Sequence, residues 1–134
     1  MIVLRLECKN FRNLSCAELL PNDGMNVICG ENAQGKTNLI EAIWLFTGAK
    51  SFRSTKDDIF VKFGEKKAIC SLDFKSNGIE NNARIEIDQK RNAFFNENKL
   101  NSAASLAGKF NAVVFSPTDL SLVSGGPNIR RRFL

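Results

Sequence analysis

The sequence predicts an α/β fold in which a mixed sheet, containing an antiparallel β-meander, surrounds one buried helix. Three observations support this class. Several short segments alternate apolar and polar residues, as strands with one buried face do. An apolar run at residues 25–29 leads into a glycine-rich loop, and a helical apolar pattern at residues 36–47 follows directly. The length of 134 residues suits one domain with a single core.

The predicted strands are short and are separated by turn residues. In residues 2–8 the even-numbered positions, from Ile2 to Cys8, are apolar and are expected to face the core. The other segments with strand-like patterns are residues 15–20, 25–29, 67–74, 83–89, 93–96 and 110–115. Residues that favour turns, such as glycine, asparagine and proline, separate most of them. The stretch from 67 to 96 therefore predicts a meander.

The helix expected at residues 36–47 has apolar residues around most of its circumference, which is typical of a helix buried on all sides. Gly48 is placed to end it, because glycine readily adopts the left-handed conformation that closes many helices. A short helix is expected at residues 102–107. Gly125-Gly126-Pro127 indicates a further helix start, and about two turns of chain follow it. We therefore expect the fold to be incomplete at Leu134 and to continue in a longer protein.

Composition limits the possible classes of function. The chain lacks histidine and its cysteines show no C-x-x-C spacing, which argues against zinc sites and histidine-based acid–base catalysis. We expect the cysteines to be small buried residues in a reducing compartment. No apolar run reaches the roughly 20 residues of a membrane span and no signal-peptide pattern is visible, so a cytoplasmic location is expected. The net charge of +5 is compatible with a polyanionic partner.

The glycine-rich loop carries the strongest motif of the sequence, a complete match to G-x-x-x-x-G-K-[ST]. Its residues are Gly30, Glu31, Asn32, Ala33, Gln34, Gly35, Lys36 and Thr37. The glycines let successive backbone N–H groups point into one concavity, where the start of the following helix also attracts phosphate oxygens. The Lys36 ammonium is expected to contact the β- and γ-phosphates, and the Thr37 hydroxyl to bind Mg²⁺. The sequence therefore predicts a P-loop NTPase.

Two other kinds of phosphate-loop protein fit the sequence less well. A GTPase needs N-K-x-D and D-x-x-G motifs, but residues 98–101 have asparagine in place of that aspartate and no D-x-x-G occurs. A small phosphotransferase, such as a nucleotide or metabolite kinase, stays open as the alternative, with the arginines at 130–132 closing over the phosphates. Such kinases usually begin with the strand that leads into the loop, whereas two strands and a turn come first here.

The segment at residues 9–13, K-N-F-R-N, together with the loop and its helix, resembles the opening of ABC-type ATPase heads of the SMC and RecF group. The segments at residues 50–53, 113–120 and 125–134 resemble the RecF branch of this group and occur in the same order. The resemblance implies that residues 1–134 are the N-terminal part of an ABC-type ATP-binding head. In the family a helical arm follows this lobe, and two heads form a homodimer around ATP.

The resemblance also implies a function in DNA replication and recombinational repair. Members of the RecF branch bind single-stranded and duplex DNA at junctions. With recombination mediators such as RecR and RecO they help to load RecA, which supports the SOS response. The whole protein is therefore expected to be a weak DNA-dependent ATPase that uses ATP and Mg²⁺ and has no membrane contact.

Two arginines outside the loop become candidate site residues through the resemblance. Arg12 and Arg53 match arginines that lie near the nucleotide or DNA in related heads. Ala33 stands where the family often has glycine, and Ser116 and Pro117 replace the magnesium-binding glutamine of SMC heads. The Walker B strand end, the signature loop and the helical arm are missing from this stretch. We therefore expect residues 1–134 alone to hold ATP without turning it over.

Overall fold

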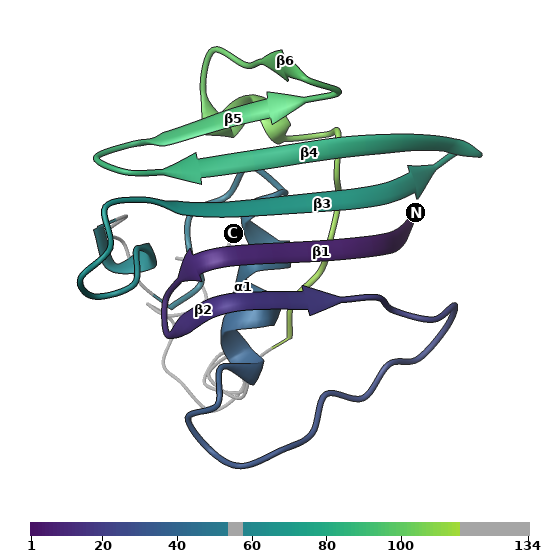
Figure 1. Ribbon diagram of the computed structural model, residues 1–134. Helices are drawn as coiled ribbons and strands as arrows, with labels where there is room; N and C mark the ends of the chain where they lie inside the picture. The colour runs from purple at the N-terminus through teal and green to yellow at the C-terminus, as the bar shows by residue number, and fades with distance from the viewer. Residues whose placement is uncertain (54–57, 116–134) are drawn as a thin grey trace, which may run out of the picture.

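The computed structural model describes residues 1–53 and 58–115, which form two layers, a six-stranded antiparallel sheet and a helix on one of its faces (Figure 1). The strand order across the sheet is β2-β1-β3-β4-β5-β6. The strands are β1 (Ile2–Phe11), β2 (Leu14–Leu19), β3 (Ala68–Ser76), β4 (Ile79–Ile87), β5 (Arg91–Phe95) and β6 (Asn98–Lys99). The helices are α1 (Lys36–Leu45) and the short 3₁₀ turns η1 (Asp58–Phe60) and η2 (Ala103–Leu106).

The predicted meander is confirmed, but the prediction of a mixed sheet is wrong for the described residues. Strands β3 to β6 follow one another through tight turns, and each pairs with the next in antiparallel orientation. Short turns permit only this orientation, because parallel neighbours need a long crossover connection. The long connection that contains α1 runs from β2 to β3, and β3 then pairs with β1, also in antiparallel orientation.

Two predicted strands are absent from the part of the chain that the structure describes. Residues 25–29 run outside the sheet, and Met25 and Val27 are 92% and 79% exposed. Residues 111–115 also lack strand pairing, although Phe110 is buried. A strand requires a neighbour for its backbone hydrogen bonds, and an apolar pattern alone does not supply one. Both segments have the composition of a buried strand without a pairing partner among the described residues.

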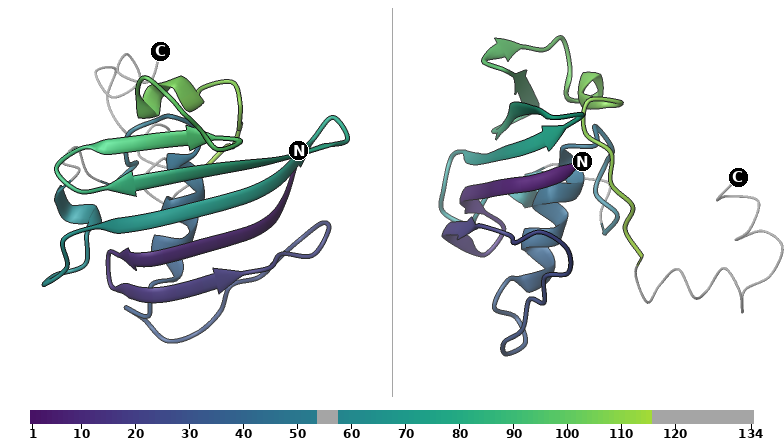
Figure 2. Two further views of the ribbon diagram at one scale, coloured as in Figure 1. Left: turned by 45° about the horizontal axis from the view of Figure 1, so that its top comes forward. Right: turned by 90° about the vertical axis from the view of Figure 1, so that its right-hand side faces the viewer.

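The core lies between the sheet and α1 (Figure 2). Its sheet side comes from alternate residues of the central strands, with Leu6 and Cys8 on β1. The expected alternation fails at the start of β1, because the register with β3 shifts between Val3 and Arg5. Val3 therefore packs against the core, and Ile2 is 44% exposed instead of facing it. A β-bulge of this kind reverses the face of the residues before it.

Helix α1 is buried on one side only, which corrects the expectation of burial all round. Ala42 and Leu45 face the core, whereas Ile40 is 39% exposed. Gly48 ends the helical stretch as expected, with φ of 79°. A side chain there would also lie 2.8 Å from the backbone nitrogen of Ala107, so the position requires glycine for space as well. The helix predicted at 102–107 is the 3₁₀ turn η2. Because Gly48 has no side chain, the backbone of η2 can pack closely against the end of α1.

The cysteines divide into a buried pair and two exposed residues. Cys8 and Cys70 lie directly opposite each other on β1 and β3 and are both buried. A hydrogen bond with Cys8 and then burial raise the pKa of the Cys70 thiol well above its ordinary value, so it stays protonated. Cys16 and Cys29 are exposed, which corrects the expectation that all are buried.

No helix within residues 1–53 and 58–115 is long and apolar enough to span a membrane.

Candidate functional site

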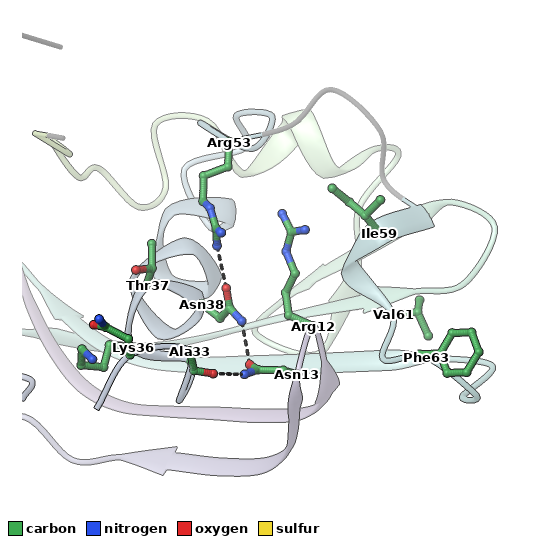
Figure 3. Close-up of a pocket in the computed structure, with 12 residues that line it drawn as sticks. Arg12, Asn13, Ala33, Lys36, Thr37, Asn38, Arg53, Ile59, Val61 and Phe63 are labelled. Carbon is green, nitrogen blue, oxygen red and sulfur yellow. Dashed lines mark hydrogen bonds between the residues drawn. The ribbon is translucent and has the colours of Figure 1, made fainter. Parts of the chain in front are cut away.

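A cavity of about 640 Å³ lies at the start of α1 and brings together parts of the chain that are far apart in sequence. Its lining consists of Arg12, Asn13, Asn32, Ala33, Gly35, Lys36, Thr37, Asn38, Arg53, Ile59, Val61 and Phe63. Figure 3 shows the loop end of this pocket on one side and the apolar residues on the other, with the arginines between them. The pocket is therefore polar and cationic at one end and apolar at the other.

The loop end is built by the turn from the glycine-rich loop into α1. Gly35 precedes the helix with φ of 98°, and its carbonyl accepts hydrogen bonds from the backbone of Asn38 and Leu39. No side chain caps this helix start, so its first N–H groups keep their capacity to bind an anion. The Lys36 ammonium donates to the carbonyls of Gly30 and Glu31 at 2.8 and 2.6 Å. An ammonium has three donors, so one is left for a ligand.

Gly35 is required by the β1–β2 turn as well as by its own backbone conformation. A Cβ atom at this position would lie 2.6 Å from Cδ2 of Leu14 and 2.8 Å from Oδ1 of Asn13. The turn that joins β1 to β2 therefore presses against the glycine-rich loop. The K-N-F-R-N segment and the loop, which the sequence separates, form one wall of the pocket.

Arg12 is held by a buried carboxylate that comes from α1. Its Nε and Nη2 atoms donate hydrogen bonds to the two carboxylate oxygens of Glu41, at 2.9 and 2.7 Å. The Glu41 side chain is fully buried and that of Arg12 is 15% exposed. The guanidinium also lies over the ring of Phe60, 4.9 Å from its centroid. This bidentate, stacked arrangement fixes Arg12 in the pocket wall.

The backbone of Arg12 is also unusual. It has φ of 56°, a conformation that residues other than glycine rarely adopt, and it occupies a two-residue turn between paired Phe11 and Leu14. Its backbone N–H donates to the carbonyl of Phe60 at 2.7 Å. Such a conformation persists only where the surroundings hold it. The Glu41 pair, the Phe60 ring and this hydrogen bond supply that restraint.

Arg53 is held less firmly than Arg12. Its NH1 group donates to Oδ1 of Asn38 at 2.7 Å and lies 3.7 Å from the Glu41 carboxylate. The side chain is 45% exposed. The segment that carries it is anchored by Trp44, whose indole N–H donates to the carbonyl of Lys50 at 2.8 Å and whose ring meets Phe52 edge to face. Arg53 is therefore a positioned cation that a bound anion can reach.

The apolar end of the pocket is Ile59, Val61 and Phe63. Val61 forms an isolated bridge with Phe11, and the backbone N–H of Lys62 donates to the carbonyl of Asn10 at 2.9 Å. These contacts tie the segment to the end of β1, beside Arg12. The Phe63 ring is fully exposed and Ile59 is 37% exposed. A flat apolar group can therefore lie against them without displacing the core.

The charges around the pocket favour an anion. Arg12, Lys36 and Arg53 line it, and none of the described residues that line it is acidic. Glu41 lies behind the lining and offsets part of the charge of the two arginines. The remaining positive charge, at a helix start, suits phosphate groups.

The structure brings most of the predicted site residues together. Arg12, Arg53 and five residues of the loop, namely Asn32, Ala33, Gly35, Lys36 and Thr37, line one pocket. Gly30, Glu31 and Gln34 belong to the loop but not to the lining. Ser116 and Pro117, which replace the magnesium-binding glutamine of SMC heads, and the arginines at 130–132 lie outside the described residues.

Sequence reasoning missed Glu41, Asn13, Asn38 and the apolar end of the pocket. Glu41 carried a usable signal, because it is the sole charged residue between Lys36 and Lys50 and stands in an otherwise apolar helix. A buried carboxylate needs a cationic partner, which the sequence could have suggested. Phe63 carried no such signal, because its role depends on a backbone contact with a distant strand.

Comparison with known proteins identifies similar chains. The family model described as the AAA domain matches residues 5–114. The DNA replication and repair protein RecF of Clostridium novyi is 38% identical over this whole chain, which spans 38% of the length of that relative. The resemblance to the RecF group is thus confirmed, for a chain that covers well under half of such relatives.

Solved structures agree with this result. A structure described as the recombination mediator protein RecF-ATP in the RecFOR pathway has a TM-score of 0.88 and 34% identity, covering 98% of this chain and 36% of that one. The SMC head domain of Thermotoga maritima has a TM-score of 0.65 and 22% identity, covering 83% of this chain and 43% of that one. The second match shows the fold alone, which is that of part of an ATPase head.

Proposed function

This chain belongs to the AAA domain family, and from that premise we propose that its pocket binds ATP together with Mg²⁺. The observation that carries the proposal is the division of the pocket into a cationic end, with Lys36 and Thr37, and an apolar end, with Ile59, Val61 and Phe63 (Figure 3). A nucleotide has the same division, with phosphates at one end and a flat base at the other. Residues 1–134 then act as the N-terminal part of an ABC-type ATP-binding head.

The residues of the loop end fit a Mg²⁺ ion that arrives with the nucleotide. In the part of the chain that the structure describes, no group of three His, Cys, Asp or Glu side chains could hold a metal ion. Mg²⁺ commonly uses one or two protein groups and takes its other oxygens from substrate phosphates and water. Thr37 is exposed at the first turn of α1, so its hydroxyl can supply the protein ligand.

The Lys36→Ala substitution tests the loop end of the pocket, where we propose that the phosphates bind. We expect ATP affinity to fall by about 10- to 100-fold, because a hydrogen bond to a charged group is worth about 1.5–3 kcal/mol. Displacement of a fluorescent ATP analogue in the presence of Mg²⁺ measures this change. The matched control is Lys75→Ala, which removes an exposed lysine of β3 outside the pocket and should leave the affinity unchanged.

Unchanged ATP affinity in the Lys36 variant would exclude this pocket as the phosphate site. The same assay compares ATP with GTP as competitors. We expect ATP to compete better, since the sequence lacks the aspartate with which GTPases read guanine. Equal competition by the two nucleotides contradicts the choice of ATP and leaves the phosphate site intact.

The Phe63→Ala substitution tests the apolar end of the pocket, where we propose that the base binds. Stacking of a base on an aromatic ring is worth about 1–3 kcal/mol, so we expect ATP affinity to fall by about 10-fold. Inorganic triphosphate has no base, and its affinity should stay the same. Ile79→Ala serves as the control, because Ile79 is also an exposed apolar residue (66%) but lies outside the pocket. Equal losses for ATP and triphosphate would place the base elsewhere.

We further propose that the whole protein acts in DNA replication and recombinational repair, as the names of its relatives state for those proteins. On this proposal it binds single-stranded and duplex DNA through phosphate contacts, works with RecR and RecO to load RecA, and dimerises with ATP. Contacts to phosphates are strongly salt-dependent and carry no sequence preference. Anisotropy of labelled duplexes of two sequences, at two salt concentrations, decides whether such contacts exist.

A further inference from the structure

We propose that Asn13 is a positioning residue of the phosphate-binding loop, which it holds in its binding conformation by restraining Ala33. The inference rests on the proposed nucleotide site and adds a residue that touches neither the phosphates nor the metal in that proposal. Two independent observations support it, namely the backbone conformation of Ala33 and the hydrogen-bond chain that ends on its carbonyl.

Ala33 has φ of 65°, which places it in the left-handed region. A residue with a Cβ atom is disfavoured there, and asparagine and glycine are the usual occupants. An isolated loop with alanine at this position would therefore leave this conformation for most of the time. The loop must be held in place by contacts from outside the strained residue.

Asn13 supplies that contact from the β1–β2 turn. Its Nδ2 group donates to the carbonyl of Ala33 at 2.7 Å, and its Oδ1 atom accepts from Nδ2 of Asn38 at 2.7 Å. Asn38 in turn accepts from Arg53 at 2.7 Å. Figure 3 shows these three hydrogen bonds as one line from Arg53 to the loop. Because Asn38 is in the first turn of α1, the Asn13 amide is oriented by the helix itself.

The direction of the Ala33 carbonyl determines the direction of the next N–H group. In a planar trans peptide the carbonyl and the N–H point to opposite sides, so the Gln34 N–H points away from the β1–β2 turn. The loop binds phosphate through such N–H groups. If the Asn13 bond is lost, the fraction of loops with this peptide orientation falls, and the apparent affinity falls in proportion.

The test is a double-mutant cycle between Asn13 and Ala33. Asn13→Ala should weaken binding of Mg²⁺–ATP by about 5- to 10-fold, as expected for one lost hydrogen bond with strain behind it. Ala33→Gly removes the strain, because glycine adopts positive φ readily. In the Ala33→Gly background, Asn13→Ala should therefore change the affinity by less than about 2-fold. A purely structural role of Asn13 predicts equal losses in the two backgrounds.

Asn98→Ala is the matched control for Asn13→Ala. Asn98 is also an exposed asparagine whose Nδ2 group donates to the carbonyl of a residue with positive φ, Asn96, at 2.9 Å. It lies outside the pocket, so its substitution should leave ATP affinity unchanged. Thermal unfolding of each variant shows that the fold is retained, since Asn13 is exposed and its loss opens no core.

Each outcome of the cycle is decisive. Equal losses in the two backgrounds, or no loss on Asn13→Ala, overturn the positioning role while Lys36→Ala still weakens binding. If Lys36→Ala also leaves the affinity unchanged, the proposed nucleotide site itself fails. The inference is supported if Asn13→Ala lowers ATP affinity in the wild-type background but not in the Ala33→Gly background, and Asn98→Ala leaves the affinity unchanged.

Discussion

Glu41→Gln is expected to lower the free energy of unfolding by about 3–5 kcal/mol, the cost of breaking a buried ion pair from one side. The Glu41 carboxylate is fully buried and accepts two hydrogen bonds from Arg12, and its other close contacts are Ser51 and Arg53. Glutamine has nearly the same volume but carries one acceptor oxygen and an NH₂ group. The NH₂ group would face an N–H of Arg12, and the guanidinium, whose side chain is 15% exposed, would lose its counter-charge.

Urea unfolding of the wild-type protein and the variant measures this difference. Glu18→Gln is the matched control, because Glu18 also pairs with an arginine, Arg5, but both side chains are more than 40% exposed. Exposed pairs of this kind contribute little, so the control should unfold almost as the wild type does. A loss at Glu41 no larger than that at Glu18 would contradict the structural role given to the buried pair.

Gly35→Ala is expected to reduce ATP affinity by about 30-fold or more. The new Cβ atom would lie 2.6 Å from Leu14 and 2.8 Å from Asn13, and the residue would also have to keep φ of 98°. Overpacking costs about 1–3 kcal/mol, and a strained backbone adds about 1–3 kcal/mol. Either the loop leaves its conformation or the β1–β2 turn moves away, and both changes dismantle the loop end of the pocket.

Gly78→Ala is the control for the general effect of an alanine at positive φ away from the pocket. Gly78 has φ of 82°, but a Cβ atom there would meet nothing within 4 Å. It lies in the β3–β4 turn outside the pocket, so the variant carries backbone strain without the close contact and should retain ATP affinity. The displacement assay used for Lys36→Ala measures both variants. ATP affinity within about 3-fold of wild type for Gly35→Ala would show that the turn yields easily.

The fold was predictable from sequence where local patterns decide it. The meander of β3 to β5 follows from alternation between strong turn signals, and the helix after the loop follows from its start at Lys36 and its end near Gly48. Pairing was not predictable in the same way. Residues 25–29 have the pattern of a buried strand, yet nothing local states whether a neighbouring strand lies beside them.

The candidate site divides in a similar manner. The loop from Gly30 to Thr37 is contiguous, so its pattern alone indicates phosphate binding. The arrangement around it joins residues from β1, α1 and the segment at 59–63, and Glu41 acquires its role only when β1 and α1 pack together. Side chains that meet through packing leave a weak trace in the sequence, such as one acidic residue in an apolar helix.

Trp44 gives the molecule a built-in optical reporter. It is the sole tryptophan of the chain. Its indole N–H donates a hydrogen bond to the carbonyl of Lys50, and its ring packs on Phe52. When tryptophan is excited selectively, the fluorescence of the protein therefore comes from Trp44 alone. This side chain holds the segment that carries Arg53. A change in that emission on adding a nucleotide reads a rearrangement next to Arg53, without any attached dye.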